Sequence, residues 1–321
     1  MDSLRVTVQS VRALHPEIRA FTLSPLPGQT LPPFEAGAHV RVRVKGQDEW
    51  REYSLIDGVN GASSSPDVYH IAVRRDPAGR GGSAFMHEQV NVGDTLELQP
   101  PRNDFPLHAH EGAAVLVAGG IGVTPLFSMA ARLCALQRPV RMHYAVRARE
   151  QAAFGDELAA LLGERLQLHV DAEAGAPMSA TALLASCGAQ DHLYVCGPQA
   201  MLDAVLAEAN ARGWPRERIH FELFTAPVVE AGDHPFELVL AQSGRTFTVS
   251  GDKSVLDVLI ANGVDPMFDC QRGECGVCAV PVLEGEIDHR DYVLTAHERA
   301  EGNVMQACVS RAKGARLVLD L

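Results

Sequence analysis

Four cysteines near the C-terminal end constrain this chain more than any other feature. Cys270, Cys275 and Cys278 lie in one short loop, and Cys308 follows after 29 further residues, which gives the spacing C-x4-C-x2-C…C. Plant-type [2Fe–2S] sites have this spacing, with two thiolates bound to each iron. Two glycines within the loop permit the close backbone approach that a cluster requires. The spacing therefore predicts an iron–sulfur site.

Two other uses of these cysteines are compatible with parts of the spacing. A structural zinc site usually has two C-x2-C pairs, whereas this chain has one. Cys275 and Cys278 alone match a thioredoxin-type redox motif. That interpretation leaves Cys270 and Cys308 without a role. The complete set of four cysteines favours the iron–sulfur cluster.

The composition narrows the class of protein and its partners. A length of 321 residues corresponds to about two or three domains. Forty acidic and 28 basic residues give a net charge of −12, which disfavours nucleic acid and anionic membranes as partners. An uncharged stretch, Ala113–Ala131, contains three glycines and Pro125, which predicts strand, turn and helix instead of a membrane span. We expect a cytoplasmic location, because the sequence shows no signal segment and no disulfide framework. We also expect a monomer.

The first hundred residues have the pattern of a small antiparallel β-barrel. Short β-rich segments alternate with clusters such as Pro25–Gly28 and Leu31–Pro33. Evenly spaced short strands of this kind are typical of antiparallel barrels. We assign residues 1–103 to this domain, with strands over Leu4–Ser10, Ile18–Leu23, Ala38–Lys45, Glu52–Leu55, Val68–Arg74 and Thr95–Gln99.

Two motifs in this barrel indicate a ligand site. Arg51, Tyr53 and Ser54 lie on one strand, where alternation places Arg51 and Tyr53 on the same face. A glycine turn, Gly79–Ser83, leads into a predicted short helix over Ala84–Val90, and backbone amides at such a start can bind phosphate. Each motif alone also fits ordinary barrel surface or a turn. Together they predict a flavin site.

Residues 111–224 alternate between strand and helix patterns, which predicts a doubly wound parallel sheet. In such sheets the ligand lies beyond the carboxyl ends of the strands, often against a glycine turn. Two turns of this kind predict a dinucleotide site, although either turn alone could serve packing. The turns follow the strands Ala114–Ala118 and His192–Cys196, and they contain Gly119, Gly120 and Gly122 in the first and Gly197 and Pro198 in the second.

The choice between NADH and NADPH depends on one acidic residue. Asp171 comes directly after the strand predicted over Leu166–Val170. A carboxylate there can accept hydrogen bonds from ribose hydroxyls, and it repels a 2′-phosphate. This position predicts NADH, although a solvated loop acid would fit the same pattern.

The order of the three parts adds a mechanistic constraint. A nicotinamide releases two electrons together as hydride, whereas a [2Fe–2S] cluster accepts one electron at a time. A flavin can take up the pair and release the electrons singly, and the predicted flavin barrel precedes the nucleotide domain. The need for such a converter strengthens the interpretation of the barrel motifs.

Across almost its whole length the chain resembles the phthalate dioxygenase reductase family, whose members fuse an FMN barrel, an NADH domain and a C-terminal plant-type ferredoxin. The order of parts implies FMN instead of FAD. The resemblance implies that Thr124 and Cys196 lie beside the nicotinamide and that Phe224 packs on the flavin, although core packing also explains Phe224. It further implies flavin contacts from Arg51, Tyr53, Ser54, Gly81, Gly82 and Ser83, and from the backbone of Ile71, Ala72 and Val73.

The C-terminal part follows a short connection. Residues 225–235 are polar, contain Pro and Gly and have no periodicity, which predicts a linker. Residues 236–321 contain hairpin patterns and a helix from Ser254 to Asn262, which fits an α+β β-grasp ferredoxin. We expect the edge of the cluster loop, near Arg272 and Glu274, to be exposed for a partner.

These expectations describe a reductase that passes electrons from NADH through FMN and its own [2Fe–2S] cluster. By resemblance, the acceptor is a separate Rieske-type aromatic oxygenase. A reductase for another acceptor, such as a monooxygenase, is one alternative. A non-enzymatic redox-sensing or electron-carrying module is the other.

Overall fold

The computed structural model of the chain describes residues 3–44, 49–58, 67–79, 81–224 and 232–321. The chain divides into two compact units, Met1–Glu222 and Leu223–Leu321. The first unit holds an antiparallel and a parallel sheet, and the second holds a mixed sheet. These three sheets confirm the predicted fold class, while the domain boundaries at 1–103, 111–224 and 236–321 stay predictions.

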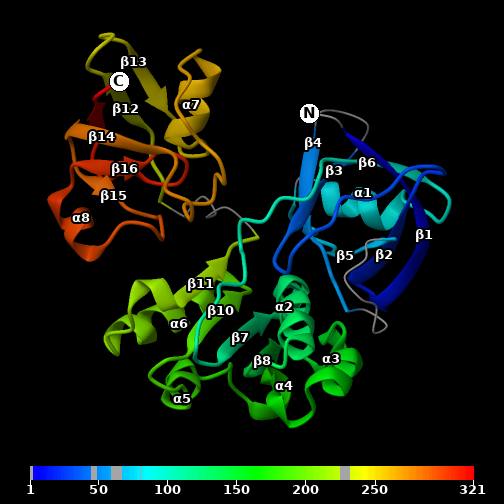
Figure 1. Cartoon of the computed structure of the whole chain (residues 1–321). Coiled ribbons are helices and arrows are strands. Elements are labelled where there is room, and N and C mark those ends of the chain that lie inside the picture. The colour runs from blue at the N-terminus through cyan, green and yellow to red at the C-terminus, as the bar shows by residue number, and fades with distance from the viewer. Residues whose placement is uncertain (1–2, 45–48, 59–66, 80, 225–231) are drawn as a thin grey trace. The chain divides into compact units, whose positions relative to one another are not determined.

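Six antiparallel strands form the first sheet, in the spatial order β4-β3-β6-β1-β2-β5 (Figure 1). Val40, Val42 and Val44 on β3 are fully buried, as alternation in a closed sheet requires. The Ile56 N–H, just after β4, donates to the carbonyl of His70 on β5 at 2.8 Å, so the sheet curls until its two end strands meet. The elements are β1 (Leu4–His15), β2 (Ile18–Pro25), β3 (His39–Val44), β4 (Glu49–Ser54), β5 (Tyr69–Arg74), α1 (Gly82–Glu88) and β6 (Thr95–Leu98).

Five parallel strands form the second sheet, in the order β11-β10-β7-β8-β9. Every residue of β7 is buried, as expected of a central strand covered on both faces. The winding direction reverses between β7 and β10, so their carboxyl ends form the switch point where such sheets bind ligands. The strands are β7 (Ala114–Gly119), β8 (Val140–Val146), β9 (Leu166–Val170), β10 (His192–Cys196) and β11 (Ile219–Glu222).

Helices cover both faces of the parallel sheet, with α2 and α3 on one side and α5 and α6 on the other (Figure 1). The helices are α2 (Val123–Ala135), α3 (Gly155–Leu162), α4 (Asp171–Ala174), α5 (Ala180–Ala185) and α6 (Gln199–Ala211), with 3-10 turns η2 (Gly120–Gly122), η3 (Arg149–Gln151), η4 (Gly163–Arg165) and η5 (Arg216–Arg218). None of the helices in the described part of the chain is long and apolar enough to cross a membrane.

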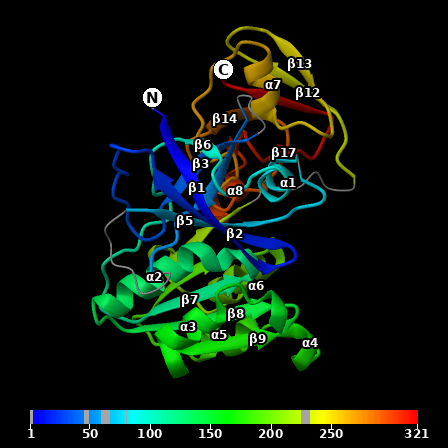
Figure 2. The same ribbon diagram turned by 90° about the vertical axis from the view of Figure 1, so that its right-hand side faces the viewer.

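Helix α2 lies between the barrel and the parallel sheet (Figure 2). Ile56 and Ala72 from the barrel belong to the same buried cluster as the apolar side chains of α2. The Ser128 hydroxyl of α2 donates to the Leu55 carbonyl at 2.8 Å and accepts from the Asp57 N–H at 2.8 Å. Because these bonds satisfy backbone groups at the junction, they fix the helix against the end of β4. No sequence motif identified Ser128 as a residue of this junction.

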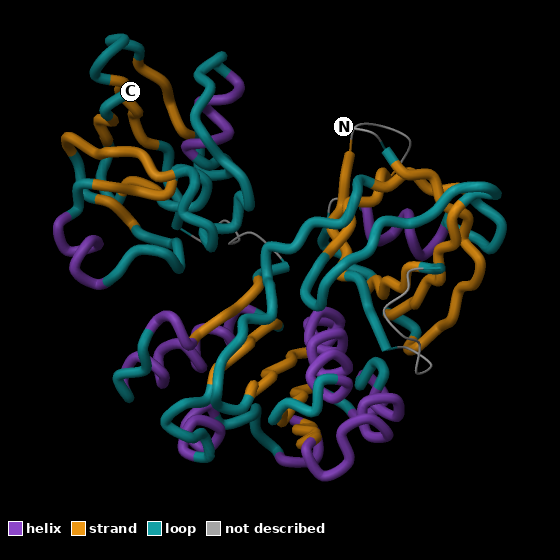
Figure 3. Tube along the Cα trace, in the orientation of Figure 1, coloured by secondary structure: helices purple, strands orange, loops and turns teal. Residues whose placement is uncertain are grey.

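The second unit is a five-stranded sheet in the order β13-β12-β18-β14-β16 with a separate β15–β17 pair. The first and last strands, β12 and β18, pair in parallel at its centre, as in a β-grasp fold. Ser254 caps α7, and its hydroxyl accepts from the Asp257 N–H at 3.0 Å, which confirms the predicted helix start. Figure 3 distinguishes the strands and helices β12 (Phe236–Leu240), β13 (Thr246–Val249), α7 (Val255–Ala261), β14 (Ala279–Glu284), β15 (Ile287–Asp288), α8 (Ala296–Glu301), β16 (Val304–Gln306), β17 (Arg311–Ala312) and β18 (Arg316–Leu319).

Candidate functional site

The four predicted iron ligands gather in the second unit as two pairs. Cys278 Sγ lies 3.2 Å from Cys308 Sγ, and the thiols of Cys270 and Cys275 are hydrogen-bonded to each other. A binuclear cluster requires two such pairs because each iron takes two thiolates. Across the residues that the structure describes, no three His, Cys, Asp or Glu side chains converge as a mononuclear metal site would require. The donor set fits a [2Fe–2S] cluster.

Backbone amides of the cluster loop point at the sulfur atoms. The Arg272 N–H donates to Cys270 Sγ at 3.3 Å, and the Gly273 amide reaches the Cys308 thiol. Burial raises the pKa of Cys270, whereas the hydrogen bond with Cys308 lowers the pKa of Cys278 to about 7. Amide donors stabilise the thiolate form, which is the form that binds iron.

Two glycines of the loop are required by backbone conformation and by space. Gly273 and Gly276 have φ values of +77° and +79°. A β-carbon on Gly273 would lie 2.8 Å from Val309 Cγ2, and one on Gly276 would lie 3.1 Å from Val293 Cγ1. The Tyr292 N–H also donates to the Gly273 carbonyl at 2.8 Å. Only glycine permits this conformation at this packing distance.

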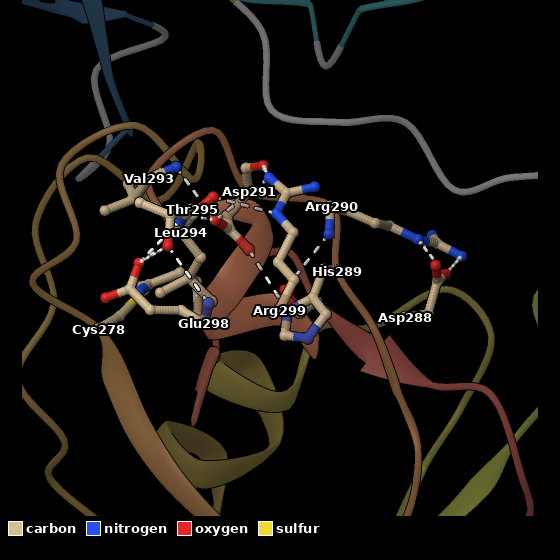
Figure 4. A network of polar contacts seen from close by, with 12 residues as sticks. Cys278, Asp288, His289, Arg290, Asp291, Val293, Leu294, Thr295, Glu298 and Arg299 are labelled. Carbon is tan, nitrogen blue, oxygen red and sulfur yellow. Dashed lines mark hydrogen bonds and ion pairs between the residues drawn. The ribbon is translucent and has the colours of Figure 1, made fainter. Parts of the chain in front are cut away.

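A buried carboxylate holds the neighbouring segment in place (Figure 4). Asp291 Oδ2 accepts from the N–H groups of Val293 at 3.0 Å and Leu294 at 2.8 Å, and the Arg299 guanidinium donates to the Asp291 carbonyl. The Asp291 side chain is fully buried. Since this segment carries Val293 against Gly276, the network supports the packing of the cluster loop. Asp291 was not identified from sequence, because its position resembles a loop acid.

The edge of the cluster loop is exposed at residues next to Arg272 and Glu274, but these two side chains themselves are not exposed. Their side chains are only 13% and 10% exposed, and Arg272 Nε lies 2.8 Å from Glu274 Oε1. Glu274 Oε2 also accepts from the Leu223 N–H at 2.9 Å, so both side chains turn inward. The exposed residues of the loop include Cys275 and Val277.

In the first unit, the structure brings the two predicted flavin motifs together. The Arg51 side chain lies against the start of α1, where a β-carbon on Gly82 would be 2.7 Å from Arg51 Nε. Gly81 precedes this helix with a φ of +86°, and the Ser83 hydroxyl accepts from the Asp76 N–H at 3.0 Å. A guanidinium beside backbone amides at a helix start is a donor set that fits a phosphate.

The remaining predicted flavin residues lie on β4 and β5. Burial raises the pKa of the Tyr53 hydroxyl, and the nearby Arg51 guanidinium partly opposes this shift. Ser54 is buried at the end of the strand. Residues 71–73 on β5 are also buried, and their side chains divide between two apolar clusters. The flavin contacts assigned to Tyr53, Ser54, Ile71, Ala72 and Val73 stay predictions.

The two glycine turns of the parallel sheet pack directly on each other. A β-carbon on Gly122 would lie 2.2 Å from the Cys196 carbonyl oxygen, and one on Gly197 would lie 2.8 Å from Gly119 Cα. A β-carbon on Gly119 would also approach Pro198 Cδ at 2.5 Å. These glycines are therefore needed for packing. Packing was the alternative to dinucleotide binding that the sequence left open for each turn.

Gly120 differs from these neighbours, because it has a φ of +53° and a β-carbon there would meet nothing within 4 Å. It faces open space at the switch point. The Thr124 hydroxyl, buried in the first turn of α2, donates to the Ile121 carbonyl at 3.1 Å. Cys196 is buried at the end of β10. Gly120, Thr124 and Cys196 thus surround the carboxyl ends of β7 and β10, where a nicotinamide is expected.

A cavity of about 440 Å³ lies at the carboxyl end of β9. Its size lies in the range of small-molecule sites. Asp171 begins α4 directly after this strand, and its charge opposes the lowering of the His169 pKa by burial. The cavity is lined by Leu168, His169, Val170, Glu173, Ala174, Ala176, Pro177, Met178 and Ser179. A ribose contact by Asp171 stays a prediction.

Phe224 belongs to the second unit and is the last described residue before position 232. Its side chain is 40% exposed, so core packing does not account for it. The neighbouring Phe221 instead lies on β11 with the Arg216 guanidinium 5.0 Å from its ring centroid. The predicted linker, residues 225–235, falls mostly outside the described residues.

Known proteins match this chain over almost its whole length. Residues 238–313 match the model of the 2Fe-2S iron-sulfur cluster binding domain, and residues 95–219 match that of the dimethylamine monooxygenase subunit DmmA-like N-terminal domain. A toluene-4-sulfonate monooxygenase system reductase subunit of Comamonas testosteroni is 42% identical over 98% of both chains. A vanillate O-demethylase oxidoreductase of a Pseudomonas species is 39% identical over 99% of this chain and all of that one. The solved structure of phthalate dioxygenase reductase is 38% identical, with a TM-score of 0.72 over 99% of this chain and 98% of that one.

Proposed function

The chain belongs to the phthalate dioxygenase reductase family, and we propose that it is the NADH-dependent, FMN-containing reductase of an oxygenase system with a separate Rieske-type oxygenase. It is an oxidoreductase that takes electrons from a pyridine nucleotide and contains a flavin and a [2Fe–2S] cluster. We propose that the flavin is FMN, that the pyridine nucleotide is NADH and that the electron acceptor is a Rieske-type oxygenase.

The observation that carries the proposal is the coexistence of three donor sets in one chain. These are the Arg51 guanidinium at the start of α1, the open Gly120 turn between β7 and β10, and the two thiol pairs of the second unit. A single-cofactor protein would need only one of them. A flavin supplies the conversion of a hydride donor's electron pair into single electrons.

The residues of the chain position the reactants and do not supply an acid or a base. Arg51 and the backbone amides after Gly81 bind the FMN phosphate. Tyr53 and Ser54 orient the flavin ring. The Thr124 hydroxyl donates its hydrogen to the Ile121 carbonyl. Its oxygen can therefore accept a hydrogen bond from the nicotinamide carboxamide. Asp171 binds the adenosine ribose and repels a 2′-phosphate.

An anaerobic titration of the holoprotein tests this function. We expect NADH to bleach the flavin and cluster absorption within one turnover, and NADPH to do so much more slowly at equal concentration. The reduced protein should then reduce a Rieske-type oxygenase faster than it reduces oxygen. A spectrum unaffected by NADH would rule out the reductase function and favour a redox-sensing or carrier module.

One observation favours a second candidate acceptor. The relative from Comamonas testosteroni is the reductase subunit of a monooxygenase system, at an identity similar to that of the demethylase oxidoreductase. A monooxygenase is therefore the second candidate acceptor.

The identity of the flavin can be tested independently of the acceptor. Heating the holoprotein releases the bound flavin, and chromatography then distinguishes FMN from FAD.

A further inference from the structure

An ion pair joins the turns that follow β8 and β9. The Arg149 guanidinium binds the Glu173 carboxylate through two hydrogen bonds, from Nε to Oε1 at 2.8 Å and from Nη2 to Oε2 at 2.7 Å. Arg149 begins η3, and Glu173 lies in α4, the helix that starts with Asp171. This two-bond geometry occupies the edge of the guanidinium that would otherwise be available to a phosphate.

The two turns are level at one edge of the parallel sheet. Val146 and Val170, the last residues of β8 and β9, are register partners. The Ala172 N–H donates to the Arg147 carbonyl at 3.0 Å, which fixes the start of α4 against the turn after β8. Each partner of the ion pair lies three residues beyond its strand, so the pair stands at the same edge as Asp171.

The ion pair also borders the cavity at the carboxyl end of β9, because Glu173 lines that cavity. In doubly wound sheets, an acid at such an edge binds the ribose hydroxyls of NAD, whereas a nearby arginine accommodates the 2′-phosphate of NADP. This chain has both groups, the acid as Asp171 and the arginine as Arg149. The arginine, however, is already bound to Glu173.

Glu173 is the main charged partner of Arg149. Its hydrogen bonds raise the pKa of Arg149, and Glu150 contributes less to this shift. The same hydrogen bonds lower the pKa of Glu173, so its carboxylate is charged at neutral pH. Both side chains are more than half exposed, at 61% and 52%. Exposed pairs contribute little to stability, so the protein should fold without this one.

We propose that Glu173 excludes NADPH by occupying the Arg149 guanidinium, which would otherwise bind the 2′-phosphate of that nucleotide. The inference rests on the proposed function, in which Asp171 binds the adenosine ribose. Asp171 repels a 2′-phosphate directly, whereas Glu173 withholds the cation that would attract it. Glu173 is therefore a specificity-determining residue and takes no part in hydride transfer.

Calorimetric titration of the holoprotein with two ligands tests this role. Adenosine 2′,5′-bisphosphate and 5′-AMP differ only in the 2′-phosphate, and their binding requires no electron transfer. In Glu173→Ala, we expect the affinity for the bisphosphate relative to 5′-AMP to rise about tenfold, the lower end of what one hydrogen bond to a charged group contributes. The KM for NADPH should fall by a similar factor, while kcat with NADPH stays the same.

Two further variants separate a released guanidinium from a general loss of negative charge. Removing Glu173 also relieves repulsion of the phosphate, so Arg149→Ala is added to Glu173→Ala. The double variant should lose the gain in relative affinity. Glu88→Ala is the matched control, because Glu88 is 54% exposed and pairs with Arg75 at 2.6 Å on the barrel. It should keep the wild-type ratio of affinities.

The outcomes separate this role from the function on which it rests. Failure of NADH to reduce the flavin of the wild-type protein overturns the proposed function. Normal reduction by NADH with an unchanged affinity ratio in Glu173→Ala overturns the role of Glu173 alone, as does an equal rise in Glu88→Ala. A gain that persists without Arg149 shows that the guanidinium does not bind the phosphate, and it overturns the inference as well.

Discussion

Single residues decide whether the flavin motifs form a site. Arg51 and Gly82 are 31 positions apart in the chain. They nevertheless meet because the barrel brings β4 against the start of α1. The absence of a side chain on Gly82 leaves room for the Arg51 guanidinium beside the helix amides. Any larger residue at position 82 would displace that cation.

Replacing Arg51 with alanine should weaken flavin retention. A charge-assisted hydrogen bond to phosphate contributes ~1.5–3 kcal/mol, so we expect the flavin to bind about 10- to 100-fold more weakly. Equilibrium dialysis of the free flavin against purified protein measures this. Arg43→Ala is the control, because Arg43 on β3 pairs with Glu97 at 2.8 Å instead. Unchanged flavin affinity in Arg51→Ala would contradict the phosphate assignment.

Elements meet at the switch point through backbone atoms. The turn after β7 and the turn after β10 approach so closely that Gly119, Gly122 and Gly197 have no space for a β-carbon. The predicted nucleotide site thus lies at two turns that support each other. A change in one turn should affect the other.

We expect Gly122→Ala to destabilise the first unit by ~1–3 kcal/mol, the usual range for overpacking. The added β-carbon would lie 2.2 Å from the Cys196 carbonyl oxygen, so the second turn must shift as well. Chemical unfolding and the KM for NADH measure the two effects. Gly314→Ala is the matched control, because a β-carbon there meets nothing within 4 Å. A stability loss equal to that of Gly314→Ala would contradict the packing argument.

Strands β8 and β9 contain two neighbouring histidines, His143 and His169, whose protonation makes the stability of the first unit depend on pH. Burial lowers the pKa of His143 to about 4, with a contribution from His169, whose ring nitrogen lies 3.1 Å away. The folded pKa lies below the unfolded value of about 6.5, so folding favours neutral His143. This stability is complete above pH 6.5 and is lost as the pH falls toward 4, by at most about 3 kcal/mol.

The corresponding experiment compares unfolding free energies between pH 7.5 and 5. His143→Leu should flatten the decline of stability with falling pH in the first unit. His15→Gln, which changes a partly exposed histidine at the end of β1, should retain the wild-type slope. An equally steep decline in His143→Leu would show that other groups account for the pH dependence.

At the scale of the whole molecule, the chain consists of two units with separate apolar cores. The first unit contains two buried clusters, and the second unit contains its own, which surrounds the cluster cysteines Cys278 and Cys308. Separate cores allow separate cooperative unfolding.

Calorimetry of the holoprotein should show two transitions. Leu238→Ala, in the core of the second unit, should destabilise one of them by ~2–5 kcal/mol and leave the other in place. Leu116→Ala, in the core of the first unit, should have the reciprocal effect. A shift of both transitions in either variant would mean that the units unfold as one.

Much of this architecture was predictable from local patterns. Cysteine spacing, glycine turns and strand periodicity are properties of neighbouring residues, and they correctly predicted the three sheets and the cap at Ser254. The roles of Ser128, Asp291 and Glu274 were not predictable in this way. Ser128 and Glu274 bind partners far away in the sequence, at Leu55 and Leu223. The Asp291 carboxylate binds the nearby N–H groups of Val293 and Leu294, but nothing local shows that it is buried.

The sequence by itself determined the chemistry of the protein, because four thiols at this spacing, a flavin motif and a nucleotide motif in order admit few functions. Tertiary structure alone decided how those parts are arranged. It paired Cys278 with Cys308 and turned Glu274 inward to Leu223. The reason is physical: ligand identity resides in side-chain type and spacing, whereas burial and charge pairing depend on which distant segments the folded chain brings together.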